Sequence, residues 1–209
     1  MSLNWQVALE QLEARLKQHP GIGLELQKAH DGDLFFPDLW AIAALNRSMS
    51  VLRGFSQSIK DNYLSAAHLV RLHLDSFLRF SAVFLVADPT EFIRRVMGGE
   101  QFNKIQSAEG KQMRDSYLVD KLEAYYPGLR QIYDYGCGYV HLSDTHVFHC
   151  LEAAVGGGIQ ISIGCTDERV TDDMRLNAIE TMIFITDRLL DEVRRYTAEK
   201  SRFPKAPAS

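Results

Sequence analysis

Residues 63–87 read YLSAAHLVRLHLDSFLRFSAVFLVA, and this stretch decides the fold class. It contains neither proline nor glycine, and its apolar residues cover most of the circumference of a helix. Asp61 and Asn62 supply a break and an N-cap before it, and Asp88-Pro89 stops it. A helix with so much apolar surface must pack between other elements. We therefore predict a long central helix over residues 63–87 in a mainly α protein.

The rest of the chain predicts an antiparallel helical bundle around this central helix. His19-Pro20-Gly21 should end the first helix, because proline removes a backbone donor and glycine permits a turn. We predict a single helical domain over residues 1–199 and a disordered tail over 200–209. From apolar residues at helical spacing, the other predicted helices cover residues 5–18, 24–30, 37–60, 91–97, 116–125, 128–142 and 172–199, with a surface loop over 99–112.

A small β-hairpin is predicted at about 146–164, before the last long helix. Isoleucines from Ile159 to Ile163 alternate with polar or small residues, as they do in strands. The glycine triplet at 156–158 is a turn signal before that strand. A glycine triplet can also cradle a phosphate, but such a site requires a helix directly after the glycines. Because a second strand follows here, the pattern favours the hairpin.

Composition excludes several classes of protein. The net charge of −4 argues against a general nucleic-acid coat, which would be basic. Cys137, Cys150 and Cys165 form neither a disulfide framework nor CxxC metal spacing, so we expect reduced thiols in a cytoplasmic protein. The N-terminus lacks a signal-peptide pattern. The most apolar stretch, residues 77–87, contains Arg79 and is shorter than the roughly 20 residues of a membrane span. We therefore expect no membrane association, and the sequence points to no cofactor.

The central helix carries a stripe of four polar residues, which at 100° per residue share an arc of about 80°. One interpretation is a solvent face with an exposed ion-pair ladder worth a few tenths of a kcal/mol per pair. The other is a partly buried polar cavity, which apolar residues at both ends of the same arc support. In that case Asp75 would orient two arginines whose free donors could hold an anion. The stripe consists of His68, Arg71, Asp75 and Arg79.

A second polar motif ends the helix predicted over 128–142. Tyr133, Cys137 and His141 are spaced by four and share a helix face. His141 lies near the helix C-terminus, where the helix dipole favours its protonated form. In the first of three interpretations, His141 caps this helix and packs against the central helix. The second is a Cys137–His141 nucleophilic pair, although one helix rarely aligns such groups for proton transfer. The third is a metal site of His141, His146 and His149 with Cys137 or Asp144, which matches no standard zinc signature.

Two strings together resemble a known family. The first is AHLVRLHLD at 67–75, and the second is Tyr-x3-Cys-x2-Val-His-x-Ser at 133–143. The chain from about 40 to 195 is similar to uncharacterised bacterial helical proteins that look like HEPN bundles, which bind nucleotides and often act as toxins or in phage defence. No helix here carries the Arg-x4–6-His motif of active HEPN ribonucleases, and Cys137 replaces the usual serine. The resemblance therefore implies the fold more than ribonuclease activity. Carried over by position, it singles out Arg71, Asp75, Tyr133, His141 and Ser143.

These observations lead to three hypotheses for function. The first is a binding or regulatory protein, in a defence or stress context, that holds a nucleotide or nucleic-acid phosphate with Arg71 and Arg79. Asp75 would orient the arginines, and His141 would donate a hydrogen bond. The second is a metal-independent ribonuclease with His141 as the catalytic acid or base. The third is a structural or interaction module without a ligand. We expect a nucleotide or RNA as partner and also consider a homodimer; the candidate ligand-binding residues are Arg71, Asp75, Arg79, His68, Tyr133 and Ser143.

Overall fold

The computed structural model describes residues 4–140, 147, 151–153, 157–161 and 169–203. The protein is mainly helical, as the sequence predicted. Short turns of 3-10 helix cover residues 29–32, 82–85 and 102–104. The helices are α1 (Trp5–Leu16), α2 (His19–Lys28), α3 (Phe36–Ser58), α4 (Tyr63–Ser81), α5 (Pro89–Met97), α6 (Asp115–Glu123), α7 (Leu129–Val140) and α9 (Asp172–Lys200).

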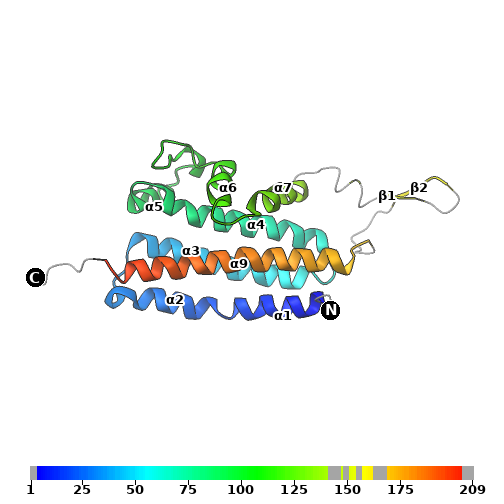
Figure 1. The fold of residues 1–209 in the computed structure, drawn as a ribbon, viewed down its shortest axis with the longest axis horizontal. Helices are drawn as coiled ribbons and strands as arrows, with labels where there is room; N and C mark the ends of the chain where they lie inside the picture. Colours follow the sequence, from blue (N-terminus) through cyan, green and yellow to red (C-terminus); the bar gives the residue numbers. More distant parts are fainter. Residues whose placement is uncertain (1–3, 141–146, 148–150, 154–156, 162–168, 204–209) are drawn as a thin grey trace, which may run out of the picture.

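The long helices lie side by side along one axis (Figure 1). The helices α1 and α2 follow one another along one side and pack against α9 and α3. A four-residue turn over 59–62 reverses the chain between α3 and α4, so these two neighbours are antiparallel. On its other side, α4 contacts α6 and α7. The central helix predicted from the sequence is therefore covered on both sides.

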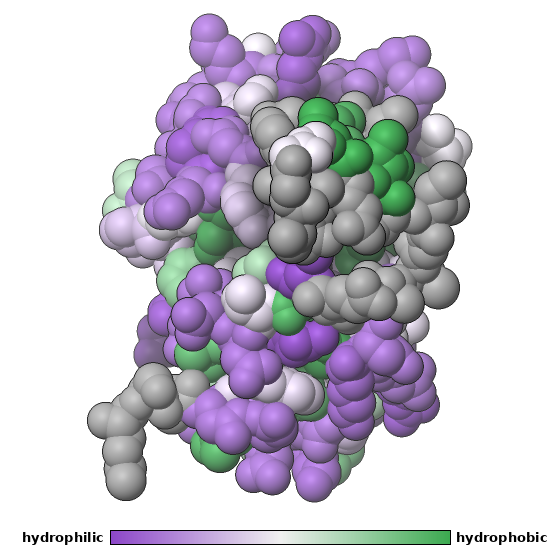
Figure 2. Space-filling model, turned by 90° about the vertical axis from the view of Figure 1, so that its right-hand side faces the viewer, coloured by the Kyte–Doolittle hydropathy of each residue, from purple (hydrophilic) through white to green (hydrophobic). Residues whose placement is uncertain are grey.

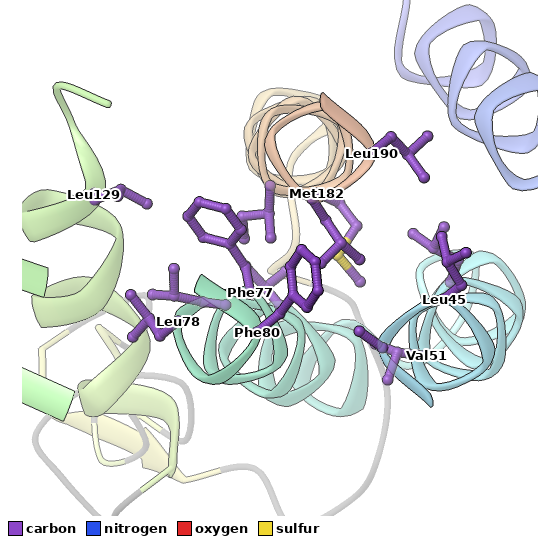
Figure 3. Packing of buried hydrophobic residues seen from close by; sticks show 14 of the residues in the cluster. Leu45, Val51, Phe77, Leu78, Phe80, Leu129, Met182 and Leu190 are labelled. Atoms are coloured by element: carbon purple, nitrogen blue, oxygen red, sulfur yellow. The ribbon is translucent and has the colours of Figure 1, made fainter. Parts of the chain in front are cut away.

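The core lies where α4 meets α3 and α9. Phe77 and Phe80 point from α4 toward Met182 of α9, with Leu45 of α3 and Leu190 of α9 nearby (Figure 3). Complete burial of one such side chain contributes about 1.5–3 kcal/mol to the free energy of unfolding. One buried apolar cluster links all the long helices and extends to the α6 and α7 side of α4.

Two helix boundaries differ from the sequence prediction. The central helix ends at Ser81, and the predicted last turns form a 3-10 turn over Ala82–Leu85. His19-Pro20-Gly21, expected to end the first helix, begins α2 instead. Proline is tolerated in the first turn of a helix, because the amide it lacks would have no partner there. This permits α2 to start directly after the two-residue turn that follows α1.

The tail was expected to be disordered from residue 200, but in the structure Lys200 ends α9 and residues 201–203 form an exposed turn that contacts the bundle through Phe203. Lys200 is the last residue of α9 and is completely buried. The carbonyl oxygen of Phe203 lies 3.1 Å from Nε2 of His30, and the Phe203 ring packs edge-on against Phe35 at 5.4 Å. The Phe203 ring contact, the hydrogen bond to His30 and backbone hydrogen bonds to the last turn of α9 therefore fix residues 201–203. Residues 204–209 lie outside the described residues.

The predicted hairpin falls largely outside the described residues. Within its range, β1 (Leu151–Ala153) and β2 (Ile159–Ile161) pair antiparallel, with Leu151 opposite Ile161. Figure 2 shows the end of the molecule where α4 and α9 begin; hydrophilic residues predominate there, and hydrophobic residues show in several smaller areas, the largest at the upper right. Among the described helices, none has the length and apolar character required to cross a membrane.

Candidate functional site

Three of the four polar residues predicted on the central helix lie in one ion-pair network. Nε of Arg79 is 3.1 Å and 3.0 Å from the two carboxylate oxygens of Asp75. Arg71 lies on the other side of Asp75, with 3.9 Å between the nearest nitrogen and oxygen. The side chains of Arg71, Asp75 and Arg79 are 12%, 20% and 39% exposed. An exposed ladder is therefore the wrong description, because α6 and α7 cover the inner part of the stripe.

A second carboxylate, Asp115, closes the network from α6. One of its oxygens lies 3.2 Å from Nη2 of Arg71, and the other lies 3.6 Å from Nη2 of Arg79. Asp115 is the first residue of α6, where the helix dipole favours a negative charge. Asp115 was not predicted as a site residue, because it lies 44 residues from Arg71 and no local pattern reveals which helix end faces the stripe. The positive charges of Arg71 and Arg79 are thus neutralised by the negative charges of Asp75 and Asp115.

Aromatic rings hold both guanidinium groups. The Arg71 guanidinium carbon lies 4.6 Å from the centre of the Tyr133 ring, and that of Arg79 lies 4.7 Å from the Phe102 ring. Such cation–π contacts contribute about 0.5–2 kcal/mol each, depending on solvent access. Tyr133 was predicted as a site residue, whereas Phe102 belongs to the segment read as a surface loop. In the structure Phe102 is buried, so part of that loop supports the site.

Gly136 allows α7 to approach α4 closely. A Cβ atom at Gly136 would lie 3.0 Å from Cδ of Arg71 and 3.2 Å from its Cβ. Burial lowers the pKa of Arg71, but a hydrogen bond to Cys137 and the carboxylates of Asp75 and Asp115 raise it by more. The guanidinium group therefore stays charged although it is largely buried. Cys137, considered above as a nucleophile, instead lies beside Arg71 as a hydrogen-bond partner.

The outer side of the network opens into a cavity of about 580 Å³, here named the loop cavity. Of the four network residues, Arg79 and Asp115 line this cavity, whereas Arg71 and Asp75 do not. Arg114 adds a second positive charge and is exposed. Among the described residues, Arg114 has no carboxylate partner. The lining residues are Arg79, Gln101, Phe102, Asn103, Arg114, Asp115, Ser116 and Tyr133.

The structure brings together four predicted site residues: Arg71, Asp75, Arg79 and Tyr133. His68 lies one turn before Arg71 on α4, where its Nδ1 contacts the Leu64 carbonyl oxygen at 2.7 Å. It does not line the loop cavity. The predicted catalytic residue His141 and the predicted ligand residue Ser143 lie outside the described residues, as do His146 and His149 of the metal interpretation.

Comparison with known proteins adds no family to this picture. No protein-family model matches the chain, and neither a curated protein nor a solved structure is significantly similar to it. The candidate site is therefore interpreted from its own geometry.

Proposed function

We propose that the protein binds a small anionic ligand, of the nucleotide type, in the loop cavity. The observation that carries this proposal is the position of Arg114 beside Arg79. The charges of Arg71 and Arg79 are balanced by Asp75 and Asp115, so Arg114 leaves the cavity with one excess positive charge. An excess of positive charge at a concave site favours an anion.

The remaining lining residues fit a nucleotide better than a bare phosphate. The cavity volume of about 580 Å³ lies within the range of roughly 300–1,000 Å³ that is common for small-molecule sites. The amides of Gln101 and Asn103 can both donate and accept hydrogen bonds, as recognition of a base or sugar requires. Tyr133, whose ring contacts the guanidinium groups of Arg71 and Arg130, also lines the cavity. We expect the phosphate at Arg79 and Arg114.

The inner residues would act as a support for this site. Asp75 binds Nε of Arg79 through both oxygens, which fixes the direction of the guanidinium plane. A residue held in this way loses little side-chain entropy when a ligand binds. Asp75 is therefore a positioning residue. The cation–π contact between Arg71 and Tyr133 holds α7 against α4.

The test is calorimetric titration of the full chain with AMP, ADP, ATP and inorganic phosphate at low and at physiological salt. Arg114→Gln should weaken nucleotide binding about tenfold or more, because a charge-assisted hydrogen bond contributes about 1.5–3 kcal/mol. Arg94→Gln is the matched control, since Arg94 is an exposed arginine on α5 outside the cavity lining. Absence of binding by the wild type, or equal binding by Arg114→Gln, would reject the proposal.

The ribonuclease hypothesis has a separate test, because it depends on His141. A cleavage assay compares wild type with His141→Ala on a short single-stranded RNA, without metal ions. Cleavage that is lost in the variant would favour a ribonuclease, and an inactive wild type excludes it. A binder without catalytic function should give nucleotide binding and no cleavage.

A further inference from the structure

A second concave surface, distinct from the loop cavity, lies between α4, α7 and α9; we name it the tyrosine groove. Its volume is about 560 Å³. Apolar side chains from all three helices form much of it, among them Val70 of α4, Ile132 of α7 and Phe184 of α9. The groove therefore offers apolar surface to a ligand on three sides.

Three tyrosines form one wall of the groove. Tyr63 and Tyr139 are buried, whereas Tyr135 is 60% exposed. The Tyr139 ring packs edge-on against both others, at 5.2 Å from Tyr135 and 6.2 Å from Tyr63. The hydroxyl groups of Tyr135 and Tyr139 are 2.9 Å apart. This hydrogen bond holds the exposed ring in place before any ligand arrives.

The charge of the groove is opposite to that of the loop cavity. Among the described residues that line it, Glu180 is the one charged side chain, and none is basic. Glu180 is exposed on α9 and has no ion-pair partner in the part of the chain that the structure describes. Phe184 follows Glu180 by four positions, so the carboxylate and the ring share a helix face. Burial raises the pKa of Tyr63 and of Tyr139, so both hydroxyl groups stay neutral.

We propose that the tyrosine groove binds a small organic cation with an apolar body. The ammonium group pairs with the Glu180 carboxylate, and the tyrosine rings that line the same groove add an attraction for positive charge. The apolar body packs between Val70, Ile132 and Phe184. This site does not depend on the proposed function of the loop cavity, because the two cavities have different lining residues and opposite charge.

The test uses three probes of similar shape and different charge: phenethylamine, 2-phenylethanol and phenylacetate. Binding is followed by methyl NMR of labelled methionines, because Met174 lines the groove. We expect saturable shifts of the Met174 methyl signal with phenethylamine, weaker binding of 2-phenylethanol and the weakest binding of phenylacetate. The proposal is overturned if phenethylamine causes no saturable shift or binds no more tightly than phenylacetate.

Substitutions at Glu180 and Tyr135 test the charged part and the aromatic part of the groove separately. Glu180→Gln should weaken phenethylamine binding about three- to tenfold and leave 2-phenylethanol unchanged, since an exposed charge contributes modestly. Glu199→Gln, an exposed glutamate on α9 outside the groove, is the matched control. Tyr135→Leu should weaken binding of both probes, and Tyr135→Phe, which keeps the ring but loses the hydrogen bond to Tyr139, should weaken it less. Unchanged binding in both Glu180→Gln and Tyr135→Leu overturns the site, as does a shift of Met174 that tracks self-association in sedimentation.

Discussion

At the scale of single residues, Gly136 decides how closely α7 approaches Arg71. Alanine is about 1 kcal/mol better than glycine inside a helix, so Gly136→Ala would be stabilising without tertiary contacts. Here the added methyl group would lie 3.0 Å from Cδ of Arg71, and overpacking of this kind costs about 1–3 kcal/mol. We expect Gly136→Ala to lower the free energy of unfolding by about 1 kcal/mol and to weaken the proposed nucleotide binding at the loop cavity.

Urea denaturation measures this change, and Gly21→Ala is the matched control. Gly21 lies in α2, and a methyl group added there would have no atom within 4 Å, so alanine should stabilise the protein at this position. Equal stabilisation by both substitutions would show that the Arg71 side chain moves away from the new methyl group without a loss in the free energy of unfolding.

The network around Gly136 also shows which site residues a sequence can reveal. Arg71, Asp75 and Arg79 share a helix face at fixed spacing, so their proximity follows from the 3.6-residue period alone. Asp115 and Phe102 reach the same place through tertiary packing of α6 and the preceding loop. No periodicity encodes such contacts between distant segments, and these residues were therefore missed.

At the scale of elements, α4 carries His73 into the interface with α9. His73 is completely buried, and its Nε2 lies 3.0 Å from the Thr186 hydroxyl oxygen. That hydroxyl donates its proton to the Met182 carbonyl, so Nε2–H of a neutral His73 is the donor to Thr186. Within the described structure, Nδ1 of His73 has no hydrogen-bond partner. Burial, with the positive charges of His19 and Arg47, lowers the pKa of His73 to about 3.

This low pKa predicts a loss of stability in mild acid. Unfolding returns the pKa of His73 to about 6.5, so below pH 6.5 the unfolded chain binds a proton that the folded chain does not. His73 should therefore lower the free energy of unfolding by about 1.4 kcal/mol per pH unit between about pH 6.5 and 3. The pKa of His19 is also lowered by burial, which adds to the same effect.

Urea denaturation at pH 7 and pH 5 measures this dependence. The wild type should lose about 2 kcal/mol from His73 over this interval. His73→Leu removes the titrating group, so this variant should lose less free energy of unfolding than the wild type between pH 7 and pH 5. A variant that loses as much as the wild type would place the acid sensitivity in other groups.

The elements themselves were predicted with differences at their ends. Apolar periodicity identified α3, α4 and α9, because each buries a continuous stripe against its neighbours. The end of α4 at Ser81 was missed, since the apolar sequence continues through the 3-10 turn that follows. Apolar periodicity reports burial, and burial persists where the backbone changes its hydrogen-bond pattern.

At the scale of the whole molecule, one buried ion pair joins segments from the two ends of the chain. Nζ of Lys200 lies 2.8 Å from Asp38, and both side chains are completely buried. Lys200 also donates to the Leu26 carbonyl oxygen at 3.0 Å, and the Tyr196 hydroxyl donates to Asp38 at 2.7 Å. Asp38 in addition accepts from the backbone amide of Phe35 and so caps α3. Segments of α2, α3 and α9 thus contact one another at the Asp38–Lys200 ion pair.

Removing one partner of this pair should be costly. Lys200→Met keeps much of the side-chain length but leaves Asp38 buried without its cation, at a cost of about 3–5 kcal/mol. Thermal and urea unfolding measure the loss. Lys17→Met, an exposed lysine after α1, should change the stability by less than about 0.5 kcal/mol. A loss below about 1 kcal/mol in Lys200→Met would mean that Asp38 finds compensation elsewhere.

The Asp38 cluster has a consequence for biosynthesis. Asp38 and Tyr196 are separated by 158 residues, and Lys200 follows Tyr196 on the last turn of α9. While the ribosome is still making α9, Asp38 therefore lacks both its cation and its tyrosine donor. Translation that stops before Tyr196 would release a chain with an unpaired aspartate in its core, which marks it as a substrate for chaperones and proteases.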